Sequence, residues 1–82
     1  MAIERLFIAN RGEIAVRINQ AAKALGITTI QAYSEADKDM MAVRIADEAI
    51  CVGPAIAKES YLDIRKMVAA AQAAGADAVH PG

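Results

Sequence analysis

Short apolar runs alternate along the chain with longer segments that have helical spacing, and two full strand–helix cycles stand out, with a shorter helical segment between them. Short apolar runs rich in branched residues predict strands, and apolar residues three and four positions apart predict helices. Four strands are expected, at 5–9, 28–33, 48–52 and 77–79, and three helices, at 12–25, 38–45 and about 60–74. Because helical crossovers join parallel strands, the expected fold is α/β. It is an open parallel sheet of about four strands with flanking helices, in the order third, second, first, fourth.

Local signals at the helix ends refine this prediction. Asn10 is expected to cap the first helix, with Glu13 reaching back to it in a capping box. Ser60 and Asp63 form a similar pair before the last helix. Gly26 follows the first helix, where glycine commonly terminates helices in the left-handed conformation.

The helical spacing also predicts which face of each helix is buried. In the first helix the predicted buried stripe consists of Ile14, Ile18, Ala21 and Leu25. In the last helix it consists of Tyr61, Ile64, Met67, Val68 and Ala71.

Composition limits the function classes. The apolar fraction is 56%, against about 45–50% in typical domains, so we expect a single small domain that packs against more protein. With a net charge of −1 and no basic run, nucleic-acid binding is not expected. No apolar stretch approaches the length of a membrane span, and the N-terminus carries no secretory signal. We expect a cytoplasmic location, with the mitochondrial matrix or a plastid left open. Cys51, in an apolar run, is expected to be buried and unreactive.

A candidate site lies where the first and fourth strands end, because parallel strands place their carboxyl ends at the same sheet edge, where open α/β folds bind ligands. Its candidate residues are Asn10, Arg11, Gly12 and Glu13 after the first strand, and His80, Pro81 and Gly82 after the fourth. Gly12 allows close backbone approach. Arg11 either pairs with a carboxylate or phosphate or ties the turn to another domain. His80 either transfers protons or contacts an anion, or is a structural side chain before a rigid turn.

Two other chemistries are tested by the same strand ends. A dinucleotide site requires Gly-x-Gly-x-x-Gly after the first strand, and only Gly12 is present, so this interpretation is disfavoured. The acids Glu35, Asp37 and Asp39 offer oxygen ligands for Mg²⁺, or simply form a solvated helix start capped by Ser34.

The sequence closely resembles the N-terminal domain of biotin carboxylases, the ATP-dependent components of acetyl-CoA, propionyl-CoA, methylcrotonyl-CoA, pyruvate and urea carboxylases. The matching segments are Ile8–Arg17, Tyr33–Asp37, Ala46–Ala49, Ser60–Ile64 and Gly75–Gly82, in the family's order and spacing. The resemblance covers essentially the whole chain. It implies a Rossmann-like (pre-ATP-grasp) domain over residues 1–82, with the ATP-grasp and C-terminal domains outside these residues.

The resemblance also implies a reaction. The complete enzyme uses MgATP to activate bicarbonate and carboxylates biotin on a carrier protein or domain, which a carboxyltransferase then uses. The family's catalytic and MgATP-binding residues have no counterpart here, so residues 1–82 are expected to form one wall of the site and to bind neither cofactor alone. A scaffolding domain without chemistry and another ATP-grasp ligase remain the alternative hypotheses.

The outer face of the first helix contributes to a homodimer in many bacterial members. Arg17 matches that pattern and is the candidate subunit contact. Gln20 and Ala24 stand where those members commonly carry Arg and Glu, and Asn19 replaces a usual apolar residue. Because two charged side chains that could form ion pairs across the interface are absent, we expect weak dimerisation or none through this face.

Overall fold

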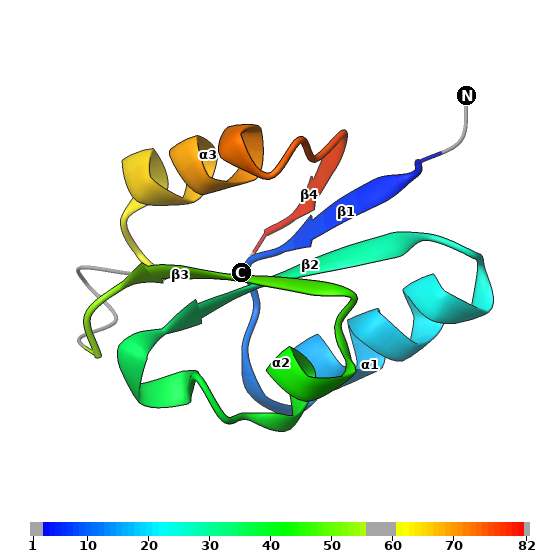
Figure 1. Cartoon of the computed structure of the whole chain (residues 1–82), viewed down its shortest axis with the longest axis horizontal. Helices are drawn as coiled ribbons and strands as arrows, with labels where there is room; N and C mark the ends of the chain where they lie inside the picture. Colours follow the sequence, from blue (N-terminus) through cyan, green and yellow to red (C-terminus); the bar gives the residue numbers. More distant parts are fainter. Residues whose placement is uncertain (1–2, 56–60, 82) are drawn as a thin grey trace.

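The computed structural model describes residues 3–55 and 61–81. Its strands are β1 (Arg5–Ile8), β2 (Thr28–Ser34), β3 (Glu48–Gly53) and β4 (Ala78–His80), and its helices are α1 (Gly12–Ala24), α2 (Met41–Ile45), α3 (Ile64–Ala73) and the short 3₁₀ helix η1 (Glu35–Asp37). The strands pair in parallel in the order β3-β2-β1-β4, so the predicted α/β sheet is confirmed (Figure 1). Strand ends differ from the prediction by about one residue.

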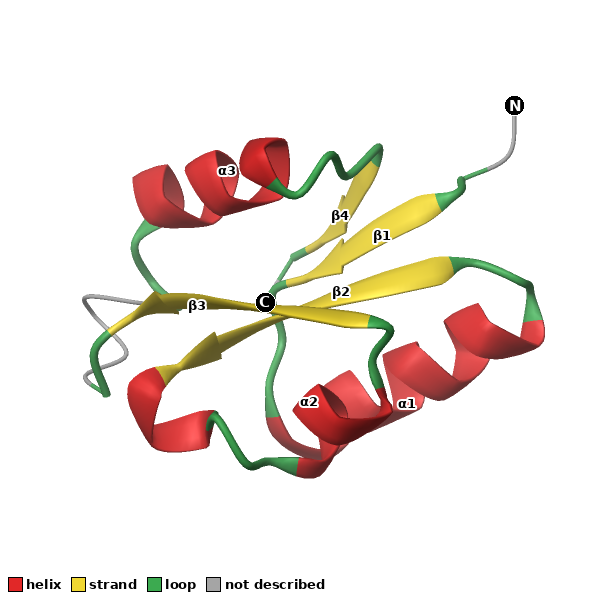
Figure 2. Ribbon diagram, viewed as in Figure 1, coloured by secondary structure: helices red, strands yellow, loops and turns green. Residues whose placement is uncertain are grey.

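The sheet separates two apolar cores. On one face α3 packs against Phe7, Ile30 and Val52 through Met67 and Ala71. On the other face lie α1 and α2 (Figure 2), and there Ile8 packs with Ala15 and Ala42. Among the described residues, none of the helices is long and apolar enough to cross a membrane.

The predicted buried stripe of α1 is mostly wrong: Ile18 packs against the Ile8 cluster as predicted, but Ala21 is exposed. Ile14 and Leu25 are 60% and 76% exposed, while Ala15, Asn19 and Ala22 face the sheet. Alanine and asparagine let the helix axis lie close to the strands, which larger side chains would prevent. Apolar residues occur almost all round this helix, so their spacing alone did not identify the packed face.

The start of α3 also differs from the prediction. The helix begins at Ile64 and its cap is Asp63, whose Oδ1 accepts a hydrogen bond from the Lys66 amide at 3.2 Å. Tyr61 lies before the helix rather than on it, and the predicted partner Ser60 lies outside the described residues. Met67 and Ala71 are buried as predicted, but Ile64 and Val68 are 77% and 50% exposed, so that part of the predicted stripe is wrong.

Two further predictions need correction in the β2–β3 region. The segment predicted as a helix from 38 to 45 contains only α2, and η1 precedes it. Cys51 is exposed, not buried. It lies on β3, an edge strand, where Val52 points into the core on the α3 side. Since neighbouring strand residues point to opposite faces, Cys51 points to the other face, where α2 packs on α1 and β2 instead.

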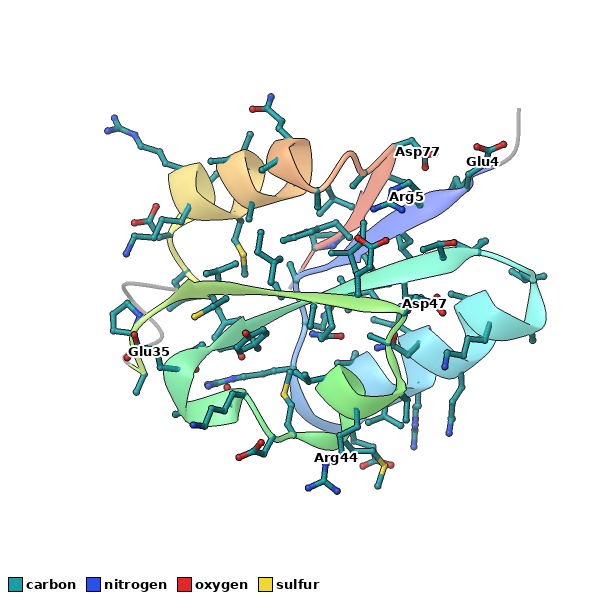
Figure 3. The ribbon with its side chains drawn as sticks, in the orientation of Figure 1. Glu4, Arg5, Glu35, Arg44, Asp47 and Asp77 are labelled. Atoms are coloured by element: carbon teal, nitrogen blue, oxygen red, sulfur yellow. The ribbon has the colours of Figure 1, made fainter. Side chains whose placement is uncertain are left out.

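The amino-terminal edge of the sheet is closed by its own polar side chains. Arg5 forms a two-pronged ion pair with Glu48, both bonds 2.9 Å long, and its guanidinium lowers the pKa of that carboxyl. The Asp77 carboxylate accepts from the amides of Glu4 and Arg5, and Asp47 accepts from the Thr29 amide at 2.8 Å. Figure 3 shows Glu4, Arg5 and Asp77 gathered where β1 begins. These internal contacts leave the carboxyl edge as the open side of the sheet.

Candidate functional site

The two predicted halves of the site meet at the carboxyl edge of the sheet. Ile8 on β1 pairs with His80 on β4, and the Ala9 amide donates to the His80 carbonyl at 3.1 Å. The next residue, Asn10, places its Oδ1 2.9 Å from Nδ1 of His80. The shared edge predicted from the sequence is therefore confirmed.

The contacts of His80 determine its tautomer. Nδ1 lies within hydrogen-bond distance of two oxygens, Asn10 Oδ1 at 2.9 Å and the Pro81 carbonyl at 3.2 Å. A carbonyl can only accept a hydrogen bond, so Nδ1 carries the proton. In the neutral ring Nε2 is then an acceptor. This assignment follows from the hydrogen-bond network around the ring.

Asn10 and Glu13 do not form the predicted capping box. The N-cap of α1 is Arg11, in extended conformation, and no side chain caps the helix. The Asn10 side chain binds His80 instead. Glu13 pairs with Arg17 at 3.1 Å, and both side chains are more than three-quarters exposed. A surface pair of this kind contributes little to stability, so Glu13 and Arg17 remain available on the outer face of α1.

Gly12 is required by the backbone rather than by a close neighbour. Its φ is +68°, a conformation that other residues rarely adopt. A Cβ built on Gly12 would meet nothing within 4 Å, so the predicted close approach is not made to the described part of this chain. Gly82, the last predicted site residue, lies outside the described residues.

Arg11 is held over an aromatic ring. Its guanidinium carbon lies 5.0 Å from the centre of the Tyr61 ring, a cation–π distance, and Nη1 is 3.9 Å from Asp37 Oδ2. The Tyr61 hydroxyl donates to Asp37 at 2.6 Å and accepts from the Ser34 amide at 3.0 Å. Tyr61 thus links the ends of β1 and β2. Sequence reasoning missed this role because the helical spacing assigned the ring to a helix face.

The acids considered as Mg²⁺ ligands do not converge. Asp37 accepts from Tyr61 and from the Ser34 hydroxyl at 3.1 Å. Within residues 3–55 and 61–81 no group of three or more metal-ligating side chains comes together. Asp37 is therefore engaged within the chain, and the three acids do not gather at one point among the described residues.

The Tyr61 hydroxyl provides a test of this cluster. Burial and the bond to Asp37 raise the pKa of Tyr61 above its usual value near 10. Because the folded state favours the neutral phenol, the stability that Tyr61 contributes is full below about pH 10 and is lost as pH rises through the folded pKa. Tyr61→Phe should lower the free energy of unfolding at pH 7 by about 1–3 kcal/mol and remove this share of the alkaline decline.

Urea unfolding between pH 7 and 11 measures both effects. Tyr33→Phe is the matched control, because among the described residues the Tyr33 hydroxyl has no hydrogen-bond partner. Equal losses of stability in the two variants would contradict the assignment of Tyr61.

An apolar groove of about 710 Å³ lies beside these residues. It is lined by Ala9, Asn10, Arg11, Ile14, Tyr61, Leu62, Ile64, Met67, Val68, Val79 and Pro81. Five of these apolar side chains, Ile14, Leu62, Ile64, Val68 and Val79, are at least half exposed. Of the predicted site residues that the structure describes, Asn10, Arg11 and Pro81 line the groove, whereas Gly12, Glu13 and His80 do not. Contiguous exposed apolar surface of this kind marks an interaction site, either for another protein or for a ligand.

Comparisons with known proteins agree with this arrangement. The sequence profile of the family described as "Biotin carboxylase, N-terminal domain" matches residues 2–82. Biotin carboxylase 1 of Bacillus subtilis is 56% identical over 80 residues, covering 98% of this chain and 18% of the relative. The mitochondrial alpha subunit of methylcrotonoyl-CoA carboxylase from Dictyostelium discoideum is 51% identical over 80 residues, covering 98% of this chain and 11% of the relative.

A solved structure supports the same assignment. The crystal structure of urea carboxylase from Kluyveromyces lactis superposes with a TM-score of 0.94 at 45% identity, covering 98% of this chain and 7% of that chain. The chain thus spans less than a fifth of the relatives that it matches. By sequence profile, identity and fold, the chain belongs to the biotin carboxylase N-terminal domain family.

Proposed function

We propose that residues 1–82 form the N-terminal domain of an ATP-dependent biotin carboxylase, a ligase that carboxylates biotin on a carrier. The observation that carries this proposal is the family match over nearly the whole chain. The described residues contain neither a metal cluster nor a glycine-rich phosphate loop. Because the chain spans only 18% and 11% of the two relatives named above, MgATP and biotin are assigned to the complete enzyme, and no catalytic step is assigned to these residues.

The part assigned to this domain is one wall of the active site. Its wall residues are Asn10, Arg11, Gly12, Glu13, His80, Pro81 and Gly82. The geometry supports this because β1 and β4 end side by side, with Asn10 bonded to His80 at 2.9 Å. Arg11 is the cation on this wall. It is held by Tyr61, while its side chain is still 54% exposed.

The apolar groove is assigned to the contact with the ATP-grasp remainder. Five apolar side chains of the groove are at least half exposed. Such a surface is better suited to packing against protein than to binding a small charged substrate. The carrier protein or domain and the carboxyltransferase are partners of the assembled enzyme. The proposed location of the enzyme is the cytoplasm, with the mitochondrial matrix or a plastid as alternatives. One relative is described as mitochondrial.

A chimera tests the proposal. This chain would replace the matching segment of Bacillus subtilis biotin carboxylase 1, to which it is 56% identical. The chimera should retain biotin-dependent ATP hydrolysis within about tenfold of the parent rate. A tenfold loss corresponds to an increase of about 1.4 kcal/mol in the activation free energy. The chain alone should show none. A chimera that folds cooperatively but lacks biotin-dependent hydrolysis would refute the assignment.

A further inference from the structure

Two polar side chains are fully buried between α1 and the sheet. Asn19 on α1 and Gln31 on β2 both have 0% exposure. Buried amides of this kind need hydrogen-bond partners, and these two supply one to each other, since Asn19 Nδ2 donates to Gln31 Oε1 at 3.0 Å. We call this pair the Asn19–Gln31 bridge.

The bridge ends on the predicted site. Gln31 Nε2 donates to the Asn10 carbonyl at 2.7 Å and to the carbonyl of Ala32, the residue after Gln31, at 2.9 Å. The Ile8 carbonyl is further away, at 3.4 Å. The Asn10 side chain in turn contacts His80. A continuous line of hydrogen bonds therefore runs from the middle of α1 to the end of β4.

The orientation of both amides is determined by this line. Gln31 must present its NH₂ group to the Asn10 carbonyl, so its oxygen faces Asn19. Asn19 must then present its own NH₂ group, which also donates to the Ala15 carbonyl at 2.9 Å. Its Oδ1 is left buried without a partner in the described structure. An unsatisfied buried oxygen is unfavourable, so packing alone gives no reason for this polar pair.

We propose that Gln31 is a positioning residue that fixes the Asn10 carbonyl, and with it the turn carrying Arg11 and Gly12, and that Asn19 holds the Gln31 amide in the required orientation. α1 and the end of β1 cannot shift relative to each other without breaking the Asn19–Gln31 bond or the bond from Gln31 to the Asn10 carbonyl. This deepens the proposed function, on which its consequence for the active-site wall rests. The bridge itself is tested without any measurement of activity.

The first measurement uses the unaltered chain. Side-chain amide protons of Gln31 should exchange with solvent at least about tenfold more slowly than those of Gln20 and Gln72, because exchange from a fully buried site requires a local opening. Gln20 and Gln72 are exposed and serve as internal controls. Equal exchange rates would overturn the proposal whatever the variants do.

The second measurement uses the double variant Asn19→Leu with Gln31→Ala, which keeps the total side-chain volume nearly constant. Replacing a buried polar pair by apolar residues is often neutral or stabilising, so its thermal midpoint should be unchanged or higher. The NMR order parameters of Asn10, Arg11 and Gly12 should nevertheless fall from about 0.85 toward 0.6. Leu25 and Gly26, at the other end of α1, should keep their values.

Gln31→Met is a second variant, because methionine fills a similar space without hydrogen bonding. It should loosen the same turn. Thr29→Val, on the same strand at the closed edge, should leave the turn ordered. A stable Gln31 variant with unchanged order parameters at Asn10–Gly12 would show that the bridge only fills space, and would overturn the proposal. Because neither readout requires biotin or ATP, its failure is distinct from failure of the chimera.

Discussion

Val68→Asp should abolish the biotin-dependent ATP hydrolysis of the chimera while leaving this domain folded. Val68 lines the apolar groove and is 50% exposed, so a carboxylate remains hydrated as long as the groove is open. Covering the groove with the ATP-grasp remainder would bury that charge among Ile64, Val79 and other apolar side chains. An unpaired buried charge costs about 3–5 kcal/mol, which is a loss of more than about 100-fold.

The control is Ala69→Asp, which adds the same charge at an exposed position of α3 that does not line the groove. It should retain activity. Urea unfolding of the two variant domains should give similar stabilities, within about 1 kcal/mol, as expected for surface positions. If Val68→Asp and Ala69→Asp chimeras were equally active, the groove would not be the contact with the remainder.

Phe7→Ala should unfold much or all of the 82-residue chain at 25 °C. Phe7 is fully buried on the central strand β1, packed with Ile30, Met67 and Ala71. Removing a buried phenylalanine costs about 3–5 kcal/mol. A chain of this length has roughly 4–12 kcal/mol of stability in total, and small domains lie toward the low end. Far-UV circular dichroism against temperature and urea measures the loss.

Val79→Ala is the matched control for this variant. Val79 is paired with Phe7 in the β1–β4 register but is 51% exposed, because it faces the groove. Its truncation should cost less than about 1 kcal/mol in the isolated chain, since little buried area is lost. Comparable destabilisation by the two variants would contradict the assignment of Phe7 to the core and of Val79 to the open groove.

The two edges of the sheet differ in a way that bears on function. At the amino edge, Arg5 pairs with Glu48 and the Asp77 carboxylate accepts from the Arg5 amide, so these polar groups are satisfied within the chain. At the carboxyl edge, Arg11 and the exposed apolar side chains of the groove are held in place but not covered. The same fold thus presents one self-contained edge and one edge suited to further contacts.

The site was predicted from the sequence only in part. The convergence of Asn10 and His80 followed from the parallel sheet, because residues after paired parallel strands must lie at one edge. The predicted helix-capping roles of Asn10 and Glu13 were wrong. Both side chains bond other side chains instead, Asn10 with His80 and Glu13 with Arg17. Tyr61 and Gln31 could not be found in this way, because each bonds the end of another strand, 27 residues away for Tyr61 and Ser34 and 21 residues away for Gln31 and Asn10.

The sequence by itself determined the number, type and order of the strands and main helices, because the short-range spacing of apolar residues and a terminating glycine such as Gly26 act within a few residues. Tertiary structure alone decided how each element is rotated against its neighbours. It turned Ala15 and Asn19, rather than Ile14, toward the sheet and left Cys51 exposed on an edge strand. The physical reason is that burial depends on what packs against a residue. That partner comes from distant parts of the chain, and in the groove it is proposed to come from the remainder of the enzyme.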